Sequence, residues 1–326
     1  MKRFPNLLTL CLLAACGGVD SLPAPTEPAP VQIEPMTTEA TGNFSVIGYF
    51  PDYRAFNPEW GRHLTDIIYF SAEPRADGTL DANRLDENVL YQMHQLLGLN
   101  KVRLLISIGG WERSDQFAAM TADSKTRKKF VKNLAEYVYV NKLNGVDFDW
   151  EFPQNEAEFQ NYISLLKEAR ADFGPKGLIV SAALSPDSDF PLKDYAIVDR
   201  IHIMSYDRQP LHSTNEQAFQ DLQEFIDAGI PREKLILGLP FYGRAITPPY
   251  SEVTYAEIVA QYHPSPGVDQ VNGIFFNGKD TIQRKTCLAM SENIGGVMIW
   301  ELAQDTEDHT SLLKSIQQTV IHGCDQ

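Results

Sequence analysis

The sequence predicts an α/β fold, a (β/α)8 TIM barrel with a short insertion between its seventh and eighth strands. Eight apolar segments alternate with segments of helical periodicity along about 280 residues, as eight β/α units require. The chain has 326 residues, of which 43% are hydrophobic, and can build the core of one such domain. A doubly wound sheet is the alternative, but no glycine-rich phosphate-binding sequence follows the first predicted strand.

The predicted strands are short apolar runs, typical of parallel strands buried on both faces. They cover residues 44–50, 66–72, 102–110, 145–151, 178–185, 200–207, 235–243 and 295–302. Between them, apolar side chains recur at helical spacing in residues 85–97, 130–138, 159–166 and 219–226.

Residues 1–15 have the features of a lipoprotein signal peptide. Lys2 and Arg3 precede the apolar core "LLTLCLLAA", which is too short to cross a bilayer. The following "LAAC" resembles the lipobox of bacterial lipoproteins, which predicts lipidation of Cys16 and a membrane anchor. By the same resemblance, Gly17 favours the outer membrane, so we expect a cell-envelope protein exposed to the periplasm or the exterior. An ordinary signal peptide with an incidental cysteine is the alternative.

Residues 16–42 are predicted to form the lipidated N-terminus and a linker. The stretch "PAPTEPAPVQIEP" is proline-rich and acidic, and no Lys or Arg occurs between Arg3 and Arg54. Such a composition favours an extended, semi-rigid spacer. Residues 43–324 remain for the barrel domain.

Charge and cysteine content exclude some classes of function. A formal net charge of −15 and a pI near 4.9 argue against a nucleic-acid partner. Beyond the signal peptide and Cys16, Cys287 and Cys324 remain, and a disulfide between them is possible in an oxidising compartment, although the sequence does not give their geometry. The seven histidines show no metal-ligand spacing, so neither a metal nor a cofactor is predicted.

A row of acids in "NGVDFDWEFP" is the strongest functional signal. Asp147, Asp149 and Glu151 alternate with Phe148 and Trp150, so the three acids share one face of a strand, each about 6.6 Å from the next, and Trp150 points outward. Acids on a buried strand are costly unless they are used or paired. Pairing with Lys or Arg is the structural alternative, but we expect no basic residue at an inward position on the flanking strands. The row should therefore retain protons at neutral pH, which makes Glu151 a candidate general acid.

Chemistry in such barrels lies at the C-terminal ends of the strands. The residues at these ends are mainly aromatic and acidic: Tyr49, Phe70, Ser107, Trp111, Asp149, Glu151, Tyr206, Asp207, Tyr242, Arg244, Trp300 and Glu301. Aromatic rings stack on sugar faces and carboxylic acids protonate glycosidic oxygens, so the pattern favours a site for a sugar polymer.

Five motifs resemble those of family 18 glycoside hydrolases, the chitinase family. "NGVDFDWEFP" resembles the DGxDxDWE signature, and the others are "SIGGW" (107–111), "IMSYD" (203–207), "GLPFYGR" (238–244) and "GGVMIWEL" (295–302). They occur in the family's order, and the likeness extends over residues 44–320.

The resemblance implies retaining hydrolysis assisted by the substrate, whose 2-acetamido group replaces the second carboxylate of most retaining enzymes. Glu151 would protonate the leaving oxygen and then activate water. Asp149 would accept a hydrogen bond from the acetamide N–H and share a proton with the deeper Asp147. Tyr206 would donate to the acetamide oxygen, and Trp300 would form the floor under the sugar.

Further substrate contacts are expected around these residues. Trp111 could stack on a neighbouring sugar and Arg244 could bind one by hydrogen bonds. The remaining predicted substrate-binding residues are Tyr49, Phe70, Met204, Asp207 and Tyr242. A core role is the alternative for Tyr206 and Trp300. His202 is expected to be an interior histidine with satisfied hydrogen bonds, neither a catalyst nor a ligand.

Two departures from the family pattern have consequences. Asn144 replaces the first Asp of the signature, at the strand entrance and away from Glu151, where it should affect local hydrogen bonding. Residues 244–294 are short for this position, with only "TYAEI" and a hairpin at "GIFFNGKD" (273–280). A shallower cleft and endo-type cleavage are therefore expected.

Three functions remain open from the sequence. The first is a chitinase that hydrolyses β-1,4-linked N-acetylglucosamine polymers, with chitin or another glycan of this sugar as partner. The second is an endo-β-N-acetylglucosaminidase that cuts the chitobiose core of N-glycans; Trp150 and Trp300 favour chitin over it. The third is a non-catalytic lectin of the same fold, which the presence of Glu151 disfavours.

Overall fold

The computed structural model describes residues 44–187 and 190–324. The predicted signal peptide (1–15), Cys16 and the linker to residue 42 lie outside the described residues. No helix in the described part of the chain is both long and apolar enough to span a membrane.

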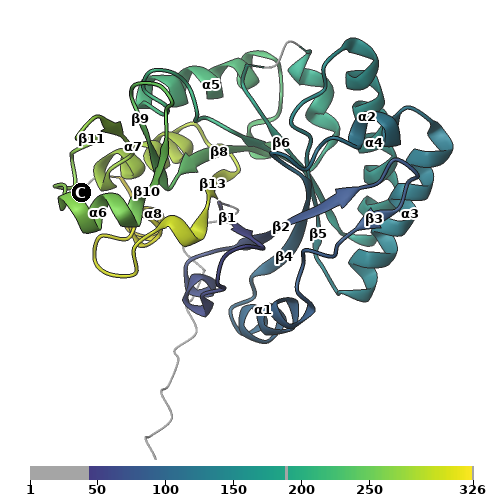
Figure 1. Ribbon diagram of the computed structural model, residues 1–326, viewed down its shortest axis with the longest axis horizontal. Helices are drawn as coiled ribbons and strands as arrows, with labels where there is room; N and C mark the ends of the chain where they lie inside the picture. Colours follow the sequence, from purple (N-terminus) through teal and green to yellow (C-terminus); the bar gives the residue numbers. More distant parts are fainter. Residues whose placement is uncertain (1–43, 188–189, 325–326) are drawn as a thin grey trace, which may run out of the picture. The chain divides into compact units, whose positions relative to one another are not determined.

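Eight parallel strands of the described residues close into a barrel, which confirms the predicted fold class (Figure 1). Their order is β1-β13-β8-β7-β6-β5-β4-β2, and pairing between β1 and β2 closes the circle. The strands are β1 (Ser45–Pro51), β2 (Asp66–Pro74), β4 (Arg103–Gly109), β5 (Gly145–Asp149), β6 (Ile179–Leu184), β7 (Arg200–Ile203), β8 (Leu235–Pro240) and β13 (Gly296–Trp300). The short strand β3 (Leu80–Asp81) extends β2 as an antiparallel partner.

Helices surround the strands (Figure 1). They are α1 (Glu87–Leu99), α2 (Phe117–Thr121), α3 (Ser124–Val140), α4 (Glu156–Phe173), α5 (Asn215–Asp227), α7 (Lys279–Ser291) and α8 (Leu312–His322). Local sequence sets their starts: Asp123 caps α3 by accepting the N–H groups of Lys125 and Thr126, and Thr214 with Gln217 forms a capping box at α5. Short 3-10 turns cover Pro58–Arg62, Gly174–Lys176, Leu192–Ile197, Arg232–Lys234 and Leu302–Gln304.

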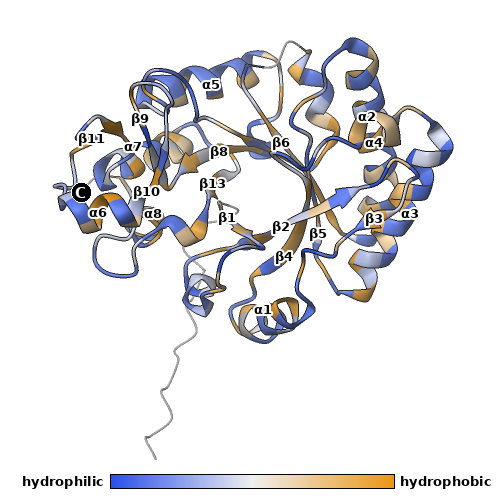
Figure 2. Cartoon of the chain, in the orientation of Figure 1, coloured by the Kyte–Doolittle hydropathy of each residue, from blue (hydrophilic) through white to orange (hydrophobic). Residues whose placement is uncertain are grey.

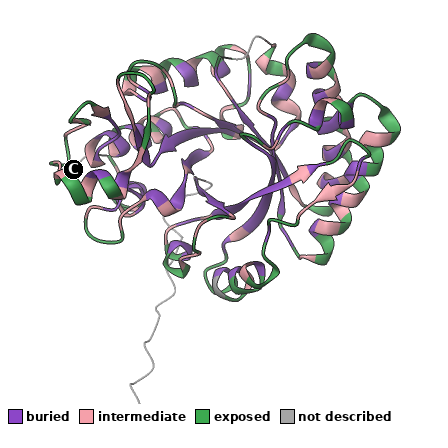
Figure 3. Cartoon of the chain, in the orientation of Figure 1, coloured by how far each residue is buried: buried purple, intermediate pink, exposed green. Residues whose placement is uncertain are grey.

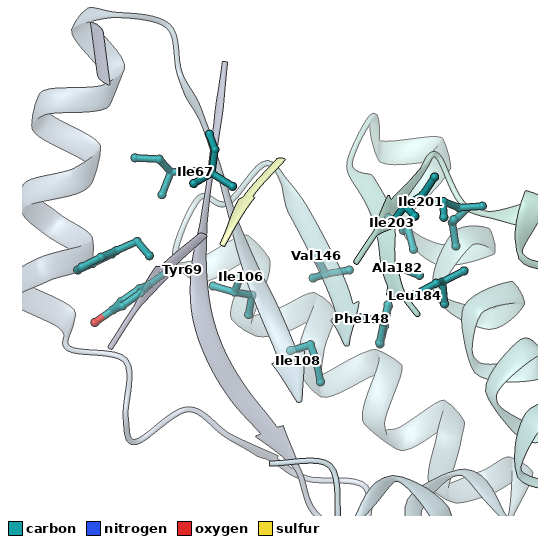
Figure 4. Packing of buried hydrophobic residues seen from close by; sticks show 14 of the residues in the cluster. Ile67, Tyr69, Ile106, Ile108, Val146, Phe148, Ala182, Leu184, Ile201 and Ile203 are labelled. Carbon is teal, nitrogen blue, oxygen red and sulfur yellow. The ribbon is translucent and has the colours of Figure 1, made fainter. Parts of the chain in front are cut away.

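Side chains on the two faces of the barrel strands form two separate cores, because strand residues alternate in direction. The outward residues pack against the helices, and Figure 4 shows such side chains on β2, β4, β5, β6 and β7, including Val146 and Phe148 on β5. Trp150 continues this outward row, as predicted, and stacks on Phe117 with ring centroids 5.1 Å apart. The strands are accordingly buried and apolar, whereas polar, exposed residues occupy the outer faces of the helices (Figures 2 and 3). Inside the barrel, a smaller apolar cluster contains Ile47, Tyr49, Ile68, Phe70, Leu105, Ile236 and Met298.

The insertion between β8 and β13 is short, as predicted, but it contains more secondary structure than the predicted short segment and one hairpin. It forms an antiparallel sheet in the order β10-β9-β12-β11, together with helix α6. The elements are β9 (Tyr242–Ala245), β10 (Glu252–Thr254), α6 (Tyr255–Tyr262), β11 (Gln270–Val271) and β12 (Ile274–Phe275). The hairpin turns at Asn272 and Gly273, whereas Asp280 already belongs to α7, so the predicted hairpin at 273–280 was placed too late.

Two predicted strands end three or four residues earlier than the sequence pattern suggested. The strand predicted over 235–243 is β8 only to Pro240, after which the chain enters β9 of the insertion. The strand predicted over 200–207 is β7 only to Ile203. Beyond it the chain curls, with Ser205 N–H bonded to Ile203 O at 2.9 Å and Asp207 at φ 65°. These curled residues carry polar side chains to the rim of the barrel.

Cys287 and Cys324 form a disulfide, with their Cα atoms 5.6 Å apart. The distance lies within the normal range for such a bond. The disulfide joins α7 to the segment after α8, so the pairing that the sequence left open is present.

Candidate active site

A cleft of about 1020 Å³ lies at the C-terminal ends of the barrel strands. It brings together eleven of the predicted site residues: Tyr49, Phe70, Trp111, Asp149, Glu151, Met204, Tyr206, Asp207, Tyr242, Arg244 and Trp300. Asp147 is the one predicted catalytic residue that does not line the cleft, since it is completely buried one layer below.

Three hydroxyl groups surround the carboxylate of Asp147. Tyr49 Oη donates to Oδ2 at 2.8 Å, Ser181 Oγ donates to Oδ1 at 2.6 Å, and Ser107 Oγ lies 3.4 Å from Oδ2. Burial raises the pKa of Asp147 to about 6, although the hydroxyl donors stabilise the ionised form and act in the opposite direction. The sequence analysis missed Ser181, yet its inward position on β6, in register with Asp147, could have indicated it.

Asp149 is 4% exposed, and its Oδ1 has no hydrogen-bond partner among the described residues. Burial raises the pKa of Asp149 well above its usual value, and the neighbouring charges of Glu151 and Asp147 raise it further. The N–H of Gly110 donates to the carbonyl oxygen of Asp149 at 2.6 Å. Gly110 has φ +100°, and a Cβ there would lie 2.2 Å from the Phe70 ring, so only glycine allows this close approach.

Glu151 lies just beyond the end of β5 and faces the cleft. Burial raises its pKa to about 7; a backbone hydrogen bond from Trp111 works against this, and the charge of Asp207 adds to it. Its carboxyl group therefore holds a proton in a large fraction of molecules at neutral pH. Ser114, in the loop after β4, accepts the backbone N–H of Glu151 at 3.1 Å. No sequence signal pointed to this loop serine.

Tyr206 lies in the curled segment after β7 and lines the cleft with its ring at 6.2 Å from that of Tyr242. Burial, followed by the charge of Asp149, raises the pKa of Tyr206 well above its usual value, so the hydroxyl keeps its proton and can donate it. Gly238 on β8 makes room for this ring. A Cβ at Gly238 would lie 2.3 Å from Ile203 O and 3.0 Å from the Tyr206 ring.

Trp300 on β13 forms an aromatic floor with two rings from β1 and β2. Its ring centroid lies 5.7 Å from that of Tyr49 and 4.8 Å from that of Phe70, in edge-on contacts. Trp300 remains partly exposed to the cleft, which distinguishes it from a residue that only fills the core.

Asp207 and Arg244 form an ion pair on one wall of the cleft. Arg244 Nη2 donates to Asp207 Oδ2 at 2.9 Å, Arg244 Nε donates to Oδ1, and Tyr242 Oη donates to Oδ1 at 2.8 Å. Burial alone would raise the pKa of Asp207, but hydrogen bonds from His212 and Arg244 outweigh it and lower the pKa. Asp207 is therefore an anion beside Glu151, and Arg244 is already engaged by it.

A family model described as glycosyl hydrolases family 18 matches residues 45–305. The chain belongs to this family. Chitinase 1 of Aphanocladium album is 24% identical over 95% of this chain and 92% of that protein. Probable chitinase 2 of Drosophila melanogaster is 23% identical over 67% of this chain, which spans only 59% of that protein. The crystal structure of the chitinase ChiB of Flavobacterium johnsoniae is similar with a TM-score of 0.74 at 27% identity, over 85% of this chain and 94% of that one.

Family membership confirms the predicted enzyme class: this family 18 protein is a glycoside hydrolase. Asn144, which departs from the family signature, lies at the entrance of β5. Its Oδ1 accepts the N–H of Leu104 at 2.8 Å, so it links two barrel strands far from the cleft, in line with the expected local role. Within residues 44–187 and 190–324, no group of three or more metal-ligating side chains is suited to a metal ion.

The expectation of no inward basic residue on the strands beside the acid row was wrong. Arg103 is at the start of β4, in the same inward alternation as Leu105 and Ser107. It pairs with Asp66 at the base of the barrel, with Nε and Oδ1 2.7 Å apart, and Arg200 binds the same oxygen at 2.9 Å. No Lys or Arg in the described part of the chain forms an ion pair with the acid row of this family 18 protein.

His202 is inside the barrel, as predicted, but only one of its nitrogens is hydrogen-bonded. Nδ1 lies 2.8 Å from Tyr49 Oη, whereas the buried Nε2 has no partner among the described residues. Burial lowers the pKa of His202 to about 3, and the charge of Arg200 adds to this effect, so the imidazole is neutral.

Residues of the loops complete the rim of the cleft, and most of them were not predicted from the sequence. The predicted Trp111 is 69% exposed there, beside Tyr53, which was not predicted and is 60% exposed. The other rim residues outside the predicted set include Arg54, Arg84, Glu112, Arg113, Phe152, Asp187, Glu252 and Gln304. Their loops have no periodic pattern, so the sequence did not indicate which of them reach the cleft.

Proposed function

We propose that this family 18 protein hydrolyses β-1,4-linked N-acetylglucosamine polymers, chitin or chitooligosaccharides, with retention of configuration and with the substrate's acetamide as nucleophile. One observation carries this proposal: Asp149 and Glu151, whose pKa is raised to about 7, line the same cleft as Tyr206 and Trp300. The relatives are named as chitinases, which supports the choice of substrate.

Glu151 supplies the proton in this mechanism. Its raised pKa, about 7, keeps the carboxyl group protonated in a large fraction of molecules near neutral pH, where it can donate to the leaving glycosidic oxygen. The resulting carboxylate then removes a proton from the attacking water. The N–H of Glu151 is tied to Ser114, which keeps this residue directed at the cleft in both steps.

Asp149 and Tyr206 orient the acetamide group. The free Oδ1 of Asp149 accepts the acetamide N–H, and the Tyr206 hydroxyl, which keeps its proton, donates to the acetamide oxygen. This oxygen attacks the anomeric carbon as the bond to the leaving oxygen breaks, which gives a cyclic oxazolinium ion. Asp149 and Asp147 share one proton during the step, so a negative charge stays close to the positive intermediate.

Aromatic side chains hold the sugars on either side of the scissile bond. Trp300 provides the floor, and the exposed Trp111 and Tyr53 offer stacking surfaces farther out. Exposed platforms on the rim and the short insertion between β8 and β13 favour binding of an internal stretch of polymer, hence endo-type cleavage.

Product analysis tests this function. The protein is incubated with N-acetylchitohexaose and, separately, with a high-mannose glycoprotein, and products are identified by mass spectrometry over time. We expect internal cleavage of the hexamer into dimers, trimers and tetramers, with the β-anomer formed first. Release of the N-glycan with an intact hexamer would indicate the endo-β-N-acetylglucosaminidase instead, and binding of the hexamer without cleavage would indicate a lectin.

We also propose that Cys16 is lipidated and anchors the enzyme in the cell envelope, with the outer membrane as the expected membrane. The "LAAC" sequence and the proline-rich, acidic residues that follow support this proposal. In bacterial cells fed with a labelled fatty acid, the full chain should acquire the label and sediment with membranes, whereas Cys16→Ala should do neither. Label on the Cys16→Ala variant would contradict lipidation at this residue.

A further inference from the structure

His202 on β7 is a buried titratable side chain that the proposed mechanism does not use, and it is 1% exposed. Its register partner on β8 is Ile236, which belongs to the apolar cluster inside the barrel. The titratable and charged groups around it are Tyr49 on β1, Asp147 on β5 and Arg200 on its own strand. Arg200 is paired with Asp66 on β2, and Asp66 also binds Arg103 on β4.

The hydroxyl of Tyr49 connects His202 to the acid row. Tyr49 Oη lies 2.8 Å from Asp147 Oδ2 and also 2.8 Å from His202 Nδ1. A hydroxyl has one proton and donates only once, so one of these two contacts must be donated by the other partner. Either His202 Nδ1–H donates to Tyr49, which donates to an ionised Asp147, or a protonated Asp147 donates to Tyr49, which donates to a bare Nδ1.

The position of Asp147 Oδ1 decides between these arrangements. His202 Nδ1 lies 3.3 Å from Oδ1, so a bare nitrogen would direct its lone pair at a carboxyl oxygen that already accepts Ser181 at 2.6 Å. A protonated Nδ1 instead donates toward both oxygens. The single ring proton then leaves Nε2 bare, so Nε2 needs no acceptor, and none of the described residues offers one.

This tautomer opposes protonation of Asp147. A proton on Oδ2 would have to point at Tyr49, the Tyr49 proton would then have to point at His202, and the ring proton would have to move to Nε2. Oδ1 faces the donors Ser181 and His202 and is no better placed to carry a proton. A proton on Oδ1 would therefore face other donors, and a proton on Oδ2 would leave the buried Nε2–H of His202 without an acceptor. Both arrangements cost free energy.

We propose that His202, held as the Nδ1–H tautomer, is a positioning residue that keeps Asp147 ionised through Tyr49, so that the protons of the acid row reside on Asp149 and Glu151. The inference rests on the proposed function for its catalytic meaning. The order of the pKa values agrees with it, since that of Asp147 is raised only to about 6 and that of Asp149 well above its usual value. Loss of the donor should allow the lower acid to take up a proton at higher pH.

Two NMR measurements test this without any substrate. In the ¹⁵N-histidine-labelled full chain, with the His202 signal assigned by its absence in His202→Asn, we expect Nδ1 protonated, Nε2 bare and no titration between about pH 5 and pH 8. In the aspartate-¹³C-labelled chain, the pKa of Asp147 should rise by about one unit or more in His202→Phe, which loses a donor to a carboxylate. A protonated Nε2, a titrating His202, or an unchanged Asp147 in a folded His202→Phe would overturn the proposal.

The catalytic readout uses a matched pair. In His202→Phe the acidic limb of the kcat/KM profile should move to higher pH by about one unit with the basic limb unchanged, whereas His202→Asn, whose amide can donate near the Nδ1 position, should show a much smaller shift. A purely structural role would lower kcat in both variants without moving the acidic limb.

If His202→Phe does not fold, the tautomer of the wild-type ring decides whether the proposal holds. Absence of hydrolysis by the wild type would contradict the proposed function, while the NMR results would still support or refute the role of His202.

Discussion

The hydroxyl of Ser114 accepts the backbone N–H of Glu151 at 3.1 Å. The same oxygen lies 3.0 Å from the carbonyl oxygen of Gly110 and 3.2 Å from that of Asp149, so its own proton is directed to these carbonyls. One buried side chain therefore joins the loop after β4 to the end of β5, where the proposed acid projects into the cleft.

Ser114→Ala should reduce kcat by about tenfold, because Glu151 loses its backbone anchor and samples positions away from the glycosidic oxygen. KM should change less, since Ser114 does not line the cleft. Initial rates on N-acetylchitooligosaccharides measure both constants. Ser291→Ala, at an exposed serine on α7, is the matched control and should behave as wild type. Equal losses in both variants would remove the special role of Ser114.

Glu151→Gln should lower hydrolysis by at least about a thousandfold, since the amide cannot donate the proton that the leaving oxygen needs. Oligosaccharide binding should persist, because Trp300, Trp111 and Asp149 remain in the cleft. Calorimetric titration with an N-acetylchitooligosaccharide, beside a hydrolysis assay, separates the two properties. Turnover close to that of the wild type would show that another group is the acid.

The pH dependence of kcat/KM should be bell-shaped. Glu151 must be protonated to act, so activity should fall as the pH rises through its pKa of about 7. As the pH falls through the pKa of Asp147, about 6, the row takes up a further proton and loses the negative charge that stabilises the intermediate. Initial rates across this range should give a narrow optimum between the two values. A rate that keeps rising well above pH 7 would contradict the assignment of Glu151.

Asp149→Asn should lower activity and raise stability. Activity should fall by about a hundredfold, because an amide at this position cannot share a proton with Asp147 and so cannot become negatively charged beside the intermediate. The folded pKa of Asp149 is raised, so its contribution to stability is present at acid pH and is lost as the pH rises through that pKa. Asn carries no such charge, and the variant should therefore have a higher Tm than the wild type, by a margin that grows with pH. A lower Tm at neutral pH would show that the ionised acid stabilises the fold.

Alternation along the strands made much of the site predictable. The order DFDWE placed Asp147 and Asp149 inside the barrel and Trp150 outside it, as the structure has them. The same rule could have indicated Ser181, which shares the inward direction on β6. The rule should also have revealed that Arg103 points into the barrel. It could not have revealed the ion pair of Arg103 with Asp66, because Asp66 lies on another strand and a single sequence does not show which strands are neighbours.

Loops were less predictable, because their positions depend on packing rather than on a repeating pattern. Nothing in the sequence around Ser114 or Tyr53 indicated that these residues reach the acid row and the rim. Strand ends had a similar limit: the apolar pattern continued through Tyr206, but the chain leaves the sheet after Ile203. In this curled segment Asp207 binds Arg244 and Tyr242, which lie far along the chain.

The dependence of cleavage on the substrate's acetamide tests the central proposal most directly. N-acetylchitotetraose and its fully de-N-acetylated counterpart, equal in length and linkage, are compared at the same concentration by the rate at which the protein cleaves each. Substrate assistance predicts cleavage of the acetylated tetramer alone, with the β-anomer formed first at the new reducing end. Comparable rates on the two tetramers, or the α-anomer formed first, would contradict it.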